Sequence, residues 1–300
     1  MIPRALRILA VATAILGSAP LAPAQSPVLY RLDPASEWTE GCFDPCACPI
    51  FIVDDLLGTM TLTFDHADPA GFDHYRVERL SWLYTQGPDD HYVCGVGEYL
   101  RGGQVVLLER LTLDLSVDGE TAQTFDSGLR PASAAFPAID VEVSLHGMVC
   151  FDTVFRVAAR PVPVREIVPY VLKRSAYAET CVPPCVCVPA LWRTQGTFGL
   201  VALGAHSTAG RQDLALVDVT WATQPSPPAR SWTGQGLFTL DASLARQRLV
   251  LDLVEPTNGA QRFDSGWIPD PHTFPRIDVD AAVGGPGCFD FVHKVHARPQ

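Results

Sequence analysis

The sequence predicts an all-β protein of two tandem homologous domains, each a β-sandwich or a small β-barrel that disulfides hold together. Three observations lead to this fold class. Short runs of residues alternate between apolar and polar side chains, two halves of the chain carry the same sequence blocks, and cysteines recur at matching places in both halves. A hydrophobic fraction of 47% in 300 residues is enough to fill two cores.

The strand pattern is clearest in two runs of the first half. Residues 111–117 and 139–145 alternate apolar and polar side chains with a period of two, which is typical of strands with one buried face. Glycine-containing turns at residues 102–103 and 118–119 interrupt the pattern. About eight short strands per half fit a sandwich or a barrel. Residues 104–111 and 240–249 have helical propensity, so we allow one short helix in each half.

The two halves align with an offset of 138–139 residues. Phe-Asp-Ser-Gly occurs at 125–128 and 263–266, and Cys-Phe-Asp occurs at 150–152 and 288–290. A period this long exceeds that of solenoid and propeller repeats, so each copy is predicted to be a domain. We assign the first copy to residues 25–161, a proline-containing linker to 162–166 and the second copy to 167–300.

The first 24 residues have the pattern of a secretory signal peptide. Arg4 and Arg7 precede an apolar run at residues 8–16, and alanines at positions 22 and 24 offer a cleavage site. The run is shorter than the ~20 residues that a membrane-spanning helix needs. We therefore expect an exported, soluble protein, periplasmic or extracellular, with no membrane anchor after cleavage.

Eight cysteines form two matching sets, each with a C-x-x-x-C-x-C cluster near the start of a copy and one cysteine near its end. The sets are Cys42, Cys46, Cys48 and Cys150 in the first copy, and Cys181, Cys185, Cys187 and Cys288 in the second. Export favours oxidation, so we expect two disulfides per copy. One would be local, from Cys42 to Cys46 or Cys48, and one would join the cluster to the distant cysteine. The alternative is a zinc or copper site built from the thiolates.

The remaining cysteine and several recurring aspartates are further candidates for function. Cys94 has no matching cysteine in the second copy, and we interpret it as a free thiol. Six aspartates recur as candidates for calcium coordination or for capping turns: Asp126, Asp140, Asp152, Asp264, Asp278 and Asp290.

Composition and motifs limit the classes of function that the protein can have. The net charge is −11 and there is no arginine-rich run, so we expect no nucleic-acid partner. The chain lacks G-x-S-x-G and H-E-x-x-H, so we assign no catalytic residue and consider an enzyme less favoured. The sequence favours a non-enzymatic binding or structural module without a cofactor, whose extracytoplasmic ligand or protein partner is unknown. Alternatives are a metal-binding protein that uses the cysteine clusters and a secreted hydrolase that uses paired carboxylates.

Overall fold

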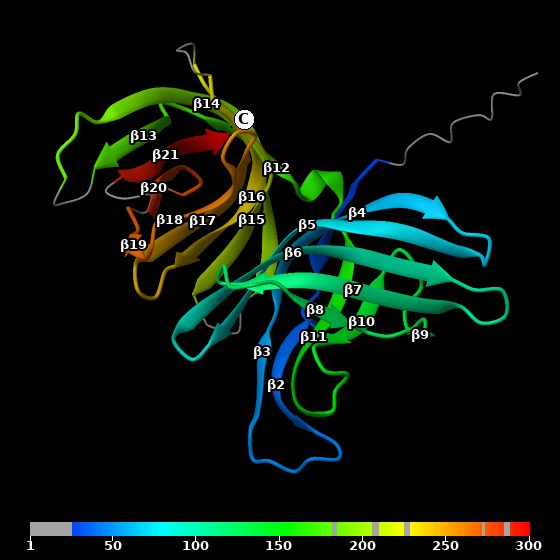
Figure 1. Ribbon diagram of the computed structural model, residues 1–300. Helices are drawn as coiled ribbons and strands as arrows, with labels where there is room; N and C mark the ends of the chain where they lie inside the picture. The colour runs from blue at the N-terminus through cyan, green and yellow to red at the C-terminus, as the bar shows by residue number, and fades with distance from the viewer. Residues whose placement is uncertain (1–25, 182–184, 206–209, 225–228, 272–273, 285–288) are drawn as a thin grey trace, which may run out of the picture.

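The computed structural model describes residues 26–181, 185–205, 210–224, 229–271, 274–284 and 289–300. The predicted signal peptide at residues 1–24 lies outside this part of the chain. Two antiparallel β-sheets form two domains that follow one another along the chain (Figure 1). The predicted all-β fold is therefore confirmed. No helix in the described part is both long and apolar enough to cross a membrane.

The first domain is an 11-stranded sheet whose strand order is β1-β4-β5-β6-β7-β8-β10-β11-β2-β3, with β9 paired to β7. β11 also pairs with β1, where Arg160 lies opposite Arg31, so the sheet closes into a barrel. The strands are β1 (Val28–Leu32), β2 (Glu37–Phe43), β3 (Phe51–Asp55), β4 (Leu57–Ala67), β5 (Phe72–Gln86), β6 (Asp89–Gly102), β7 (Leu108–Val117), β8 (Gln123–Asp126), β9 (Arg130–Pro131), β10 (Ile139–Ser144) and β11 (Cys150–Pro161).

The second domain is a 10-stranded sheet with the order β12-β14-β13-β21-β20-β18-β17-β16-β15, and β19 pairs with β17. Further pairings of β14 with β15 and of β12 with β21 close this sheet as well. The strands are β12 (Val168–Leu172), β13 (Ala176–Cys181), β14 (Ala190–Ala205), β15 (Arg211–Thr223), β16 (Ser231–Asp241), β17 (Arg246–Glu255), β18 (Gly259–Asp264), β19 (Ile268–Pro269), β20 (Ile277–Gly284) and β21 (Phe289–Pro299).

The hydrogen-bonding register allows the two domains to be compared position by position. Tyr30 lies opposite Met60 in the first domain, as Tyr170 lies opposite Phe198 in the second. We call two residues equivalent when they hold the same place in this shared pattern.

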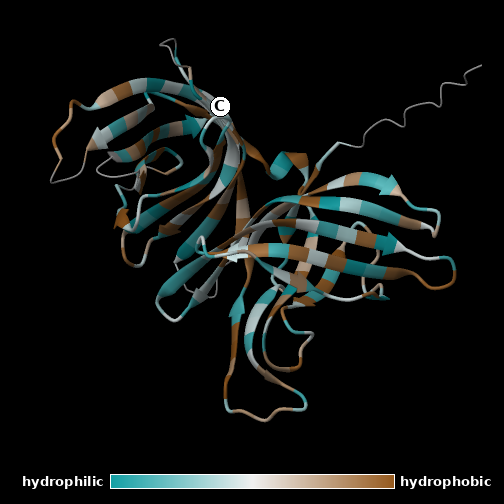
Figure 2. Cartoon of the chain, viewed as in Figure 1, coloured by the Kyte–Doolittle hydropathy of each residue, from teal (hydrophilic) through white to brown (hydrophobic). Residues whose placement is uncertain are grey.

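Each barrel has its own apolar core, built from alternate residues of its strands. Leu111, Leu113 and Leu115 are buried, whereas Thr112 and Asp114 between them are not, as the sequence pattern predicts. Figure 2 shows the same alternation of hydrophobic and hydrophilic bands along many strands. The first core is centred on Trp82 and its neighbours, and the second core includes the equivalent Trp221.

The two short helices that the sequence allows are not formed. Residues 104–107 are a loop, residues 108–117 belong to β7, and residues 242–245 are a turn between β16 and β17. Strand pairing with β6 and β16 overrides the helical propensity, which is a weak preference. A 3₁₀ turn, η1 (Val164–Glu166), lies in the predicted linker instead.

A third apolar cluster joins the two domains. It combines Leu57, Leu83 and Tyr92 of the first domain with residues from the second, which include Val201, Val217, Leu237 and Val250. Beside this cluster, Arg211 of the second domain pairs with Asp90 of the first at 2.7 Å, and both side chains are buried. The outer face of one barrel is thus packed against the outer face of the other.

Candidate functional site

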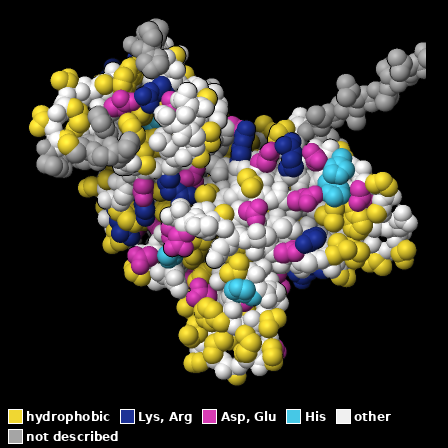
Figure 3. Space-filling model, viewed as in Figure 1, with side chains coloured by type: hydrophobic (Ala, Val, Ile, Leu, Met, Phe, Trp, Pro, Cys, Tyr) yellow, Lys and Arg dark blue, Asp and Glu magenta, His cyan; other side chains and the backbone are white. Residues whose placement is uncertain are grey.

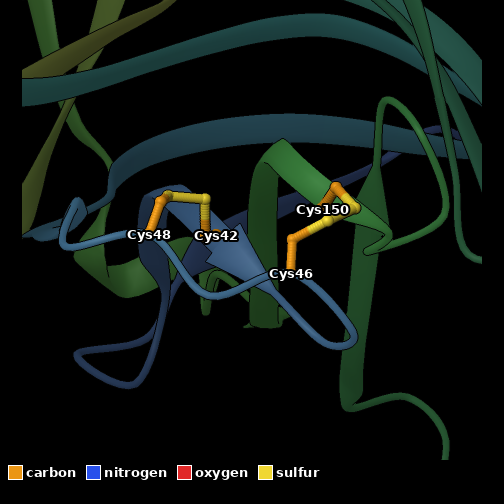
Figure 4. Close-up of a disulfide and its surroundings, with 4 residues drawn as sticks. All are labelled: Cys42, Cys46, Cys48 and Cys150. Atoms are coloured by element: carbon orange, nitrogen blue, oxygen red, sulfur yellow. A yellow bond between two sulfur atoms is a disulfide. The ribbon is translucent and has the colours of Figure 1, made fainter.

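The cysteines of the first domain are joined in two disulfides (Figure 4). Cys42 is bonded to Cys48, and Cys46 to Cys150. This agrees with the predicted local bridge plus long bridge, and it selects Cys48 as the local partner. The first bridge closes the β2–β3 hairpin, and the second holds this hairpin against the start of β11. The hairpin carries exposed apolar side chains, such as Phe51, which is 59% exposed, and hydrophobic side chains cover its tip (Figure 3).

The second domain repeats the local bridge, between Cys181 and Cys187. Cys185 is also disulfide-bonded, and its predicted partner, Cys288, lies outside the described residues. Sulfur atoms bonded to one another are not thiolates, so the bonded cysteines do not offer the ligands that a zinc or copper site requires. Cys94 is free and lies at the boundary between the domains, where burial raises the pKa of its thiol.

The candidate aspartates mostly serve local structure. Asp126 and Asp264 each accept a hydrogen bond from the glycine N–H two residues later, so each carboxylate caps its own turn. The others lie apart along the last two strands of each barrel. Asp152 accepts hydrogen bonds from three backbone N–H groups, Asp140 pairs with Arg156, Asp278 pairs with His296, and Asp290 lies opposite Thr180. Among the described residues, no group of three or more His, Cys, Asp and Glu could hold a metal ion.

A groove on the outside of the second domain brings together residues that the sequence analysis did not single out. It has a volume of about 1220 Å³, and strands β12, β14, β15 and β16 contribute to its walls. None of the described residues that line it is acidic. Its cationic residues are Lys173, Arg174, Arg193, Arg276 and Arg298. We call this feature the basic groove.

Local structure explains how the cationic side chains reach the groove. Lys173 and Arg174 occupy the tight turn between β12 and β13, where Arg174 has a left-handed backbone with φ of 60°. Arg193 lies on β14 opposite Ala176, and Arg298 lies at the end of β21 opposite Val171. Arg276 directly precedes β20, so four separate segments of the chain place positive charge around one hollow.

Four of the five cationic residues of the basic groove have no acidic partner among the described residues. No carboxylate there lies within ion-pair distance of Lys173, Arg174, Arg193 or Arg298. The first domain differs at the equivalent positions. Its Asp33 corresponds to Lys173, because both donate a backbone hydrogen bond at 2.6 Å to equivalent carbonyls of the last strand. Asp55 is equivalent to Arg193, since each lies opposite the first residues of the preceding strand.

The effect of these exchanges is seen at an arginine that occurs at the equivalent position of both domains. Arg160 in the first domain forms a salt bridge with Asp33 at 2.6 Å. Its equivalent, Arg298, shares the walls of three adjoining hollows with Lys173 instead. Like charges held near each other repel, and a bound anion relieves that repulsion. Arginine also offers a planar fork of N–H donors that matches carboxylate and phosphate oxygens.

The barrel interior next to the groove is also more polar than its counterpart. Thr194 and Trp232 line the groove and stand where the first domain has Leu56 and Val93. Thr194 Oγ1 and Trp232 Nε1 are buried without a hydrogen-bond partner among the described residues. Trp221 Nε1 is unpaired too, but so is Nε1 of its equivalent, Trp82. Unpaired buried polar atoms are uncommon in native structures, and those of Thr194 and Trp232 have no counterpart in Leu56 and Val93 of the first domain.

A buried histidine lies behind these residues. His293 is 1% exposed and contacts the rings of Tyr177, Trp221, Trp232 and Phe263. Burial lowers its pKa to about 3, so the ring is neutral at physiological pH. Its equivalent in the first domain is Phe155, which packs against Trp82, Tyr84 and Phe125.

No protein-family model, curated protein or solved structure matches the chain. The candidate site therefore rests on the geometry and charge of these residues. The sequence did contain a signal for it. Alignment of the two copies draws attention to residues that match, whereas the basic groove is made of residues that do not match, such as Asp33 against Lys173.

Proposed function

We propose that this chain is a non-enzymatic binding protein whose second domain holds an anionic ligand in the basic groove. The observation that carries the proposal is the reversal of charge between equivalent positions, Asp33 to Lys173 and Asp55 to Arg193, which leaves Arg298 without the acidic partner that Arg160 has. The ligand would carry carboxylate, phosphate or sulfate groups, because these present paired oxygens to guanidinium groups. The acidic charge of the whole chain, −11, argues against nucleic acid as this ligand.

We further propose that the protein is exported and that its two domains are homologous copies. The pattern at residues 1–24 and the disulfides support export. The common strand order and the shared sequence blocks support duplication. In this proposal the first copy kept acidic residues at these positions, such as Asp33 and Asp55, and the second copy became the binding domain.

The test is a calorimetric titration of the chain without residues 1–24 with sodium pyrophosphate at low ionic strength. We expect saturable binding that weakens as salt is added. Arg298→Ala should weaken binding about tenfold or more, since a charge-assisted hydrogen bond contributes roughly 1.5–3 kcal/mol.

Arg160→Ala is the matched control, because it removes the same charge from the equivalent position of the first domain. Its affinity for pyrophosphate should stay within about twofold of the wild type. The proposal fails if the wild type shows no saturable binding, or if the two alanine variants lose affinity equally.

A further inference from the structure

A second hollow, of about 550 Å³, lies between the two domains and shares no lining residue with the basic groove. Strands β5, β6 and β7 line it from the first domain, and β16, β17 and β18 line it from the second. Its volume falls within the ~300–1,000 Å³ range that is usual for small-molecule sites, which often lie at domain boundaries. We call it the interdomain cleft.

The walls of the interdomain cleft expose apolar side chains from both domains. Val96 of β6 is 55% exposed and Val254 of β17 is 46% exposed. Ala122 and Ala260, which are equivalent residues, add apolar surface on each side. Valines at equivalent places are not a requirement of the fold, because the residue equivalent to Val96 is Gln235 and the residue equivalent to Val254 is Ser116. The apolar walls of the cleft are therefore a property of these particular residues and not of the barrel fold.

The charged residues of the cleft balance one another. Arg262 forms a two-point ion pair with Asp252, at 2.7 and 3.0 Å. Arg79 pairs with Asp218 at 2.6 Å, and Asp114 accepts a hydrogen bond from Thr124. The lining contains two arginines and two aspartates, so its charges cancel. A charged ligand would gain no net attraction here and would lose hydration on entry.

We propose that the interdomain cleft binds an uncharged, mainly apolar small molecule that contacts both domains at once. This site is separate from the basic groove, and neither proposal depends on the other. Cys94 lies in the cleft wall as a free thiol and reports on its occupancy. A ligand that covers this wall shields the thiol from alkylation.

The test uses N-phenyl-1-naphthylamine, an uncharged apolar fluorophore, as the probe. Its fluorescence should rise saturably with added protein. Saturating probe should slow the reaction of N-ethylmaleimide with Cys94 at least about threefold, measured by mass spectrometry of the Cys94 peptide. Val96→Asp should weaken probe binding about tenfold or more, because it places a charge in the apolar wall. The exposure of Val96 means that this variant should still fold, which circular dichroism checks.

Two control variants locate the binding. Val106→Asp changes an equally exposed valine in the loop before β7, also 55% exposed, and should leave probe affinity unchanged. Phe51→Asp tests the apolar tip of the β2–β3 hairpin, which could bind the probe instead. The inference is overturned if Phe51→Asp, rather than Val96→Asp, abolishes the fluorescence, or if the probe leaves the alkylation rate of Cys94 unchanged.

Discussion

The two domains share a strand order but differ in what they place on their outer faces. One row of paired residues across β4 to β7 in the first domain is polar throughout, and the equivalent row across β14 to β17 in the second is apolar. The rows are Thr63, Arg76, Glu98 and Thr112, and Val201, Ala215, Leu237 and Val250. The apolar row is buried at the domain boundary, whereas Arg76 and Glu98 are exposed.

A second pair of equivalent rows shows the reverse: the row of the first domain is covered, and the row of the second domain is open. Leu57, Leu83 and Tyr92 of the first domain are covered by the second domain, and Leu83 is 0% exposed. The equivalent row of the second domain is Gln195, Ala222 and Ser231, which lines the basic groove. The residues that point into each barrel thus determine its fold, and the residues that point outward determine what each outer face contacts. The face that is used for domain packing in the first domain is left open in the second.

The largest effect should come from making the apolar row polar. Leu237→Glu gives the second domain the residue of its equivalent, Glu98, and buries a charge at the boundary. We expect the free energy of unfolding to fall by about 3 kcal/mol or more, measured by urea denaturation. The reciprocal change, Glu98→Leu, lies on an exposed face and should alter stability by no more than about 0.5 kcal/mol. Equal losses in both variants would contradict the assignment of the boundary.

A smaller, pH-dependent effect should follow from the histidine in the second core. The pKa of His293 is about 3 in the folded chain and ~6.5 when unfolded, so the unfolded state binds the extra proton between these values. Stability is therefore retained above about pH 6.5 and falls by up to ~1.4 kcal/mol per pH unit as the pH drops toward 3. His293→Phe copies Phe155 and should remove this contribution. Denaturation curves of both proteins at pH 7 and pH 4.5 measure it, and an unchanged pH dependence in the variant would refute the role of His293.

The barrel architecture could be predicted from the sequence because it depends on inward residues with a period of two. Leu111, Leu113 and Leu115 show that period directly. The choice of Cys48 over Cys46 as the partner of Cys42 could not be predicted, because both separations allow a local bridge. Helical propensity at residues 240–249 was misleading, because a tight turn within this segment leads directly into β17.

The two candidate binding sites depend on spacing between strands and domains that no local pattern encodes. Lys173, Arg193 and Arg298 are far apart in the sequence and meet only because β12, β14 and β21 are neighbours in the barrel. The interdomain cleft depends on how one barrel packs against the other. The sequence contains one part of the information on these sites, namely the residue differences between equivalent positions of the two copies.

The most direct test of the central claim, that charge reversal made the second domain an anion-binding domain, is the pyrophosphate affinity of Lys173→Asp. This change restores the aspartate of the first domain and gives Arg298 the partner that Arg160 has. Arg165→Asp, an exposed change of the same charge in the linker, is the control. We predict that Lys173→Asp weakens calorimetric binding at least about tenfold while Arg165→Asp changes it less than about twofold. Equal affinities in the two variants would contradict the account.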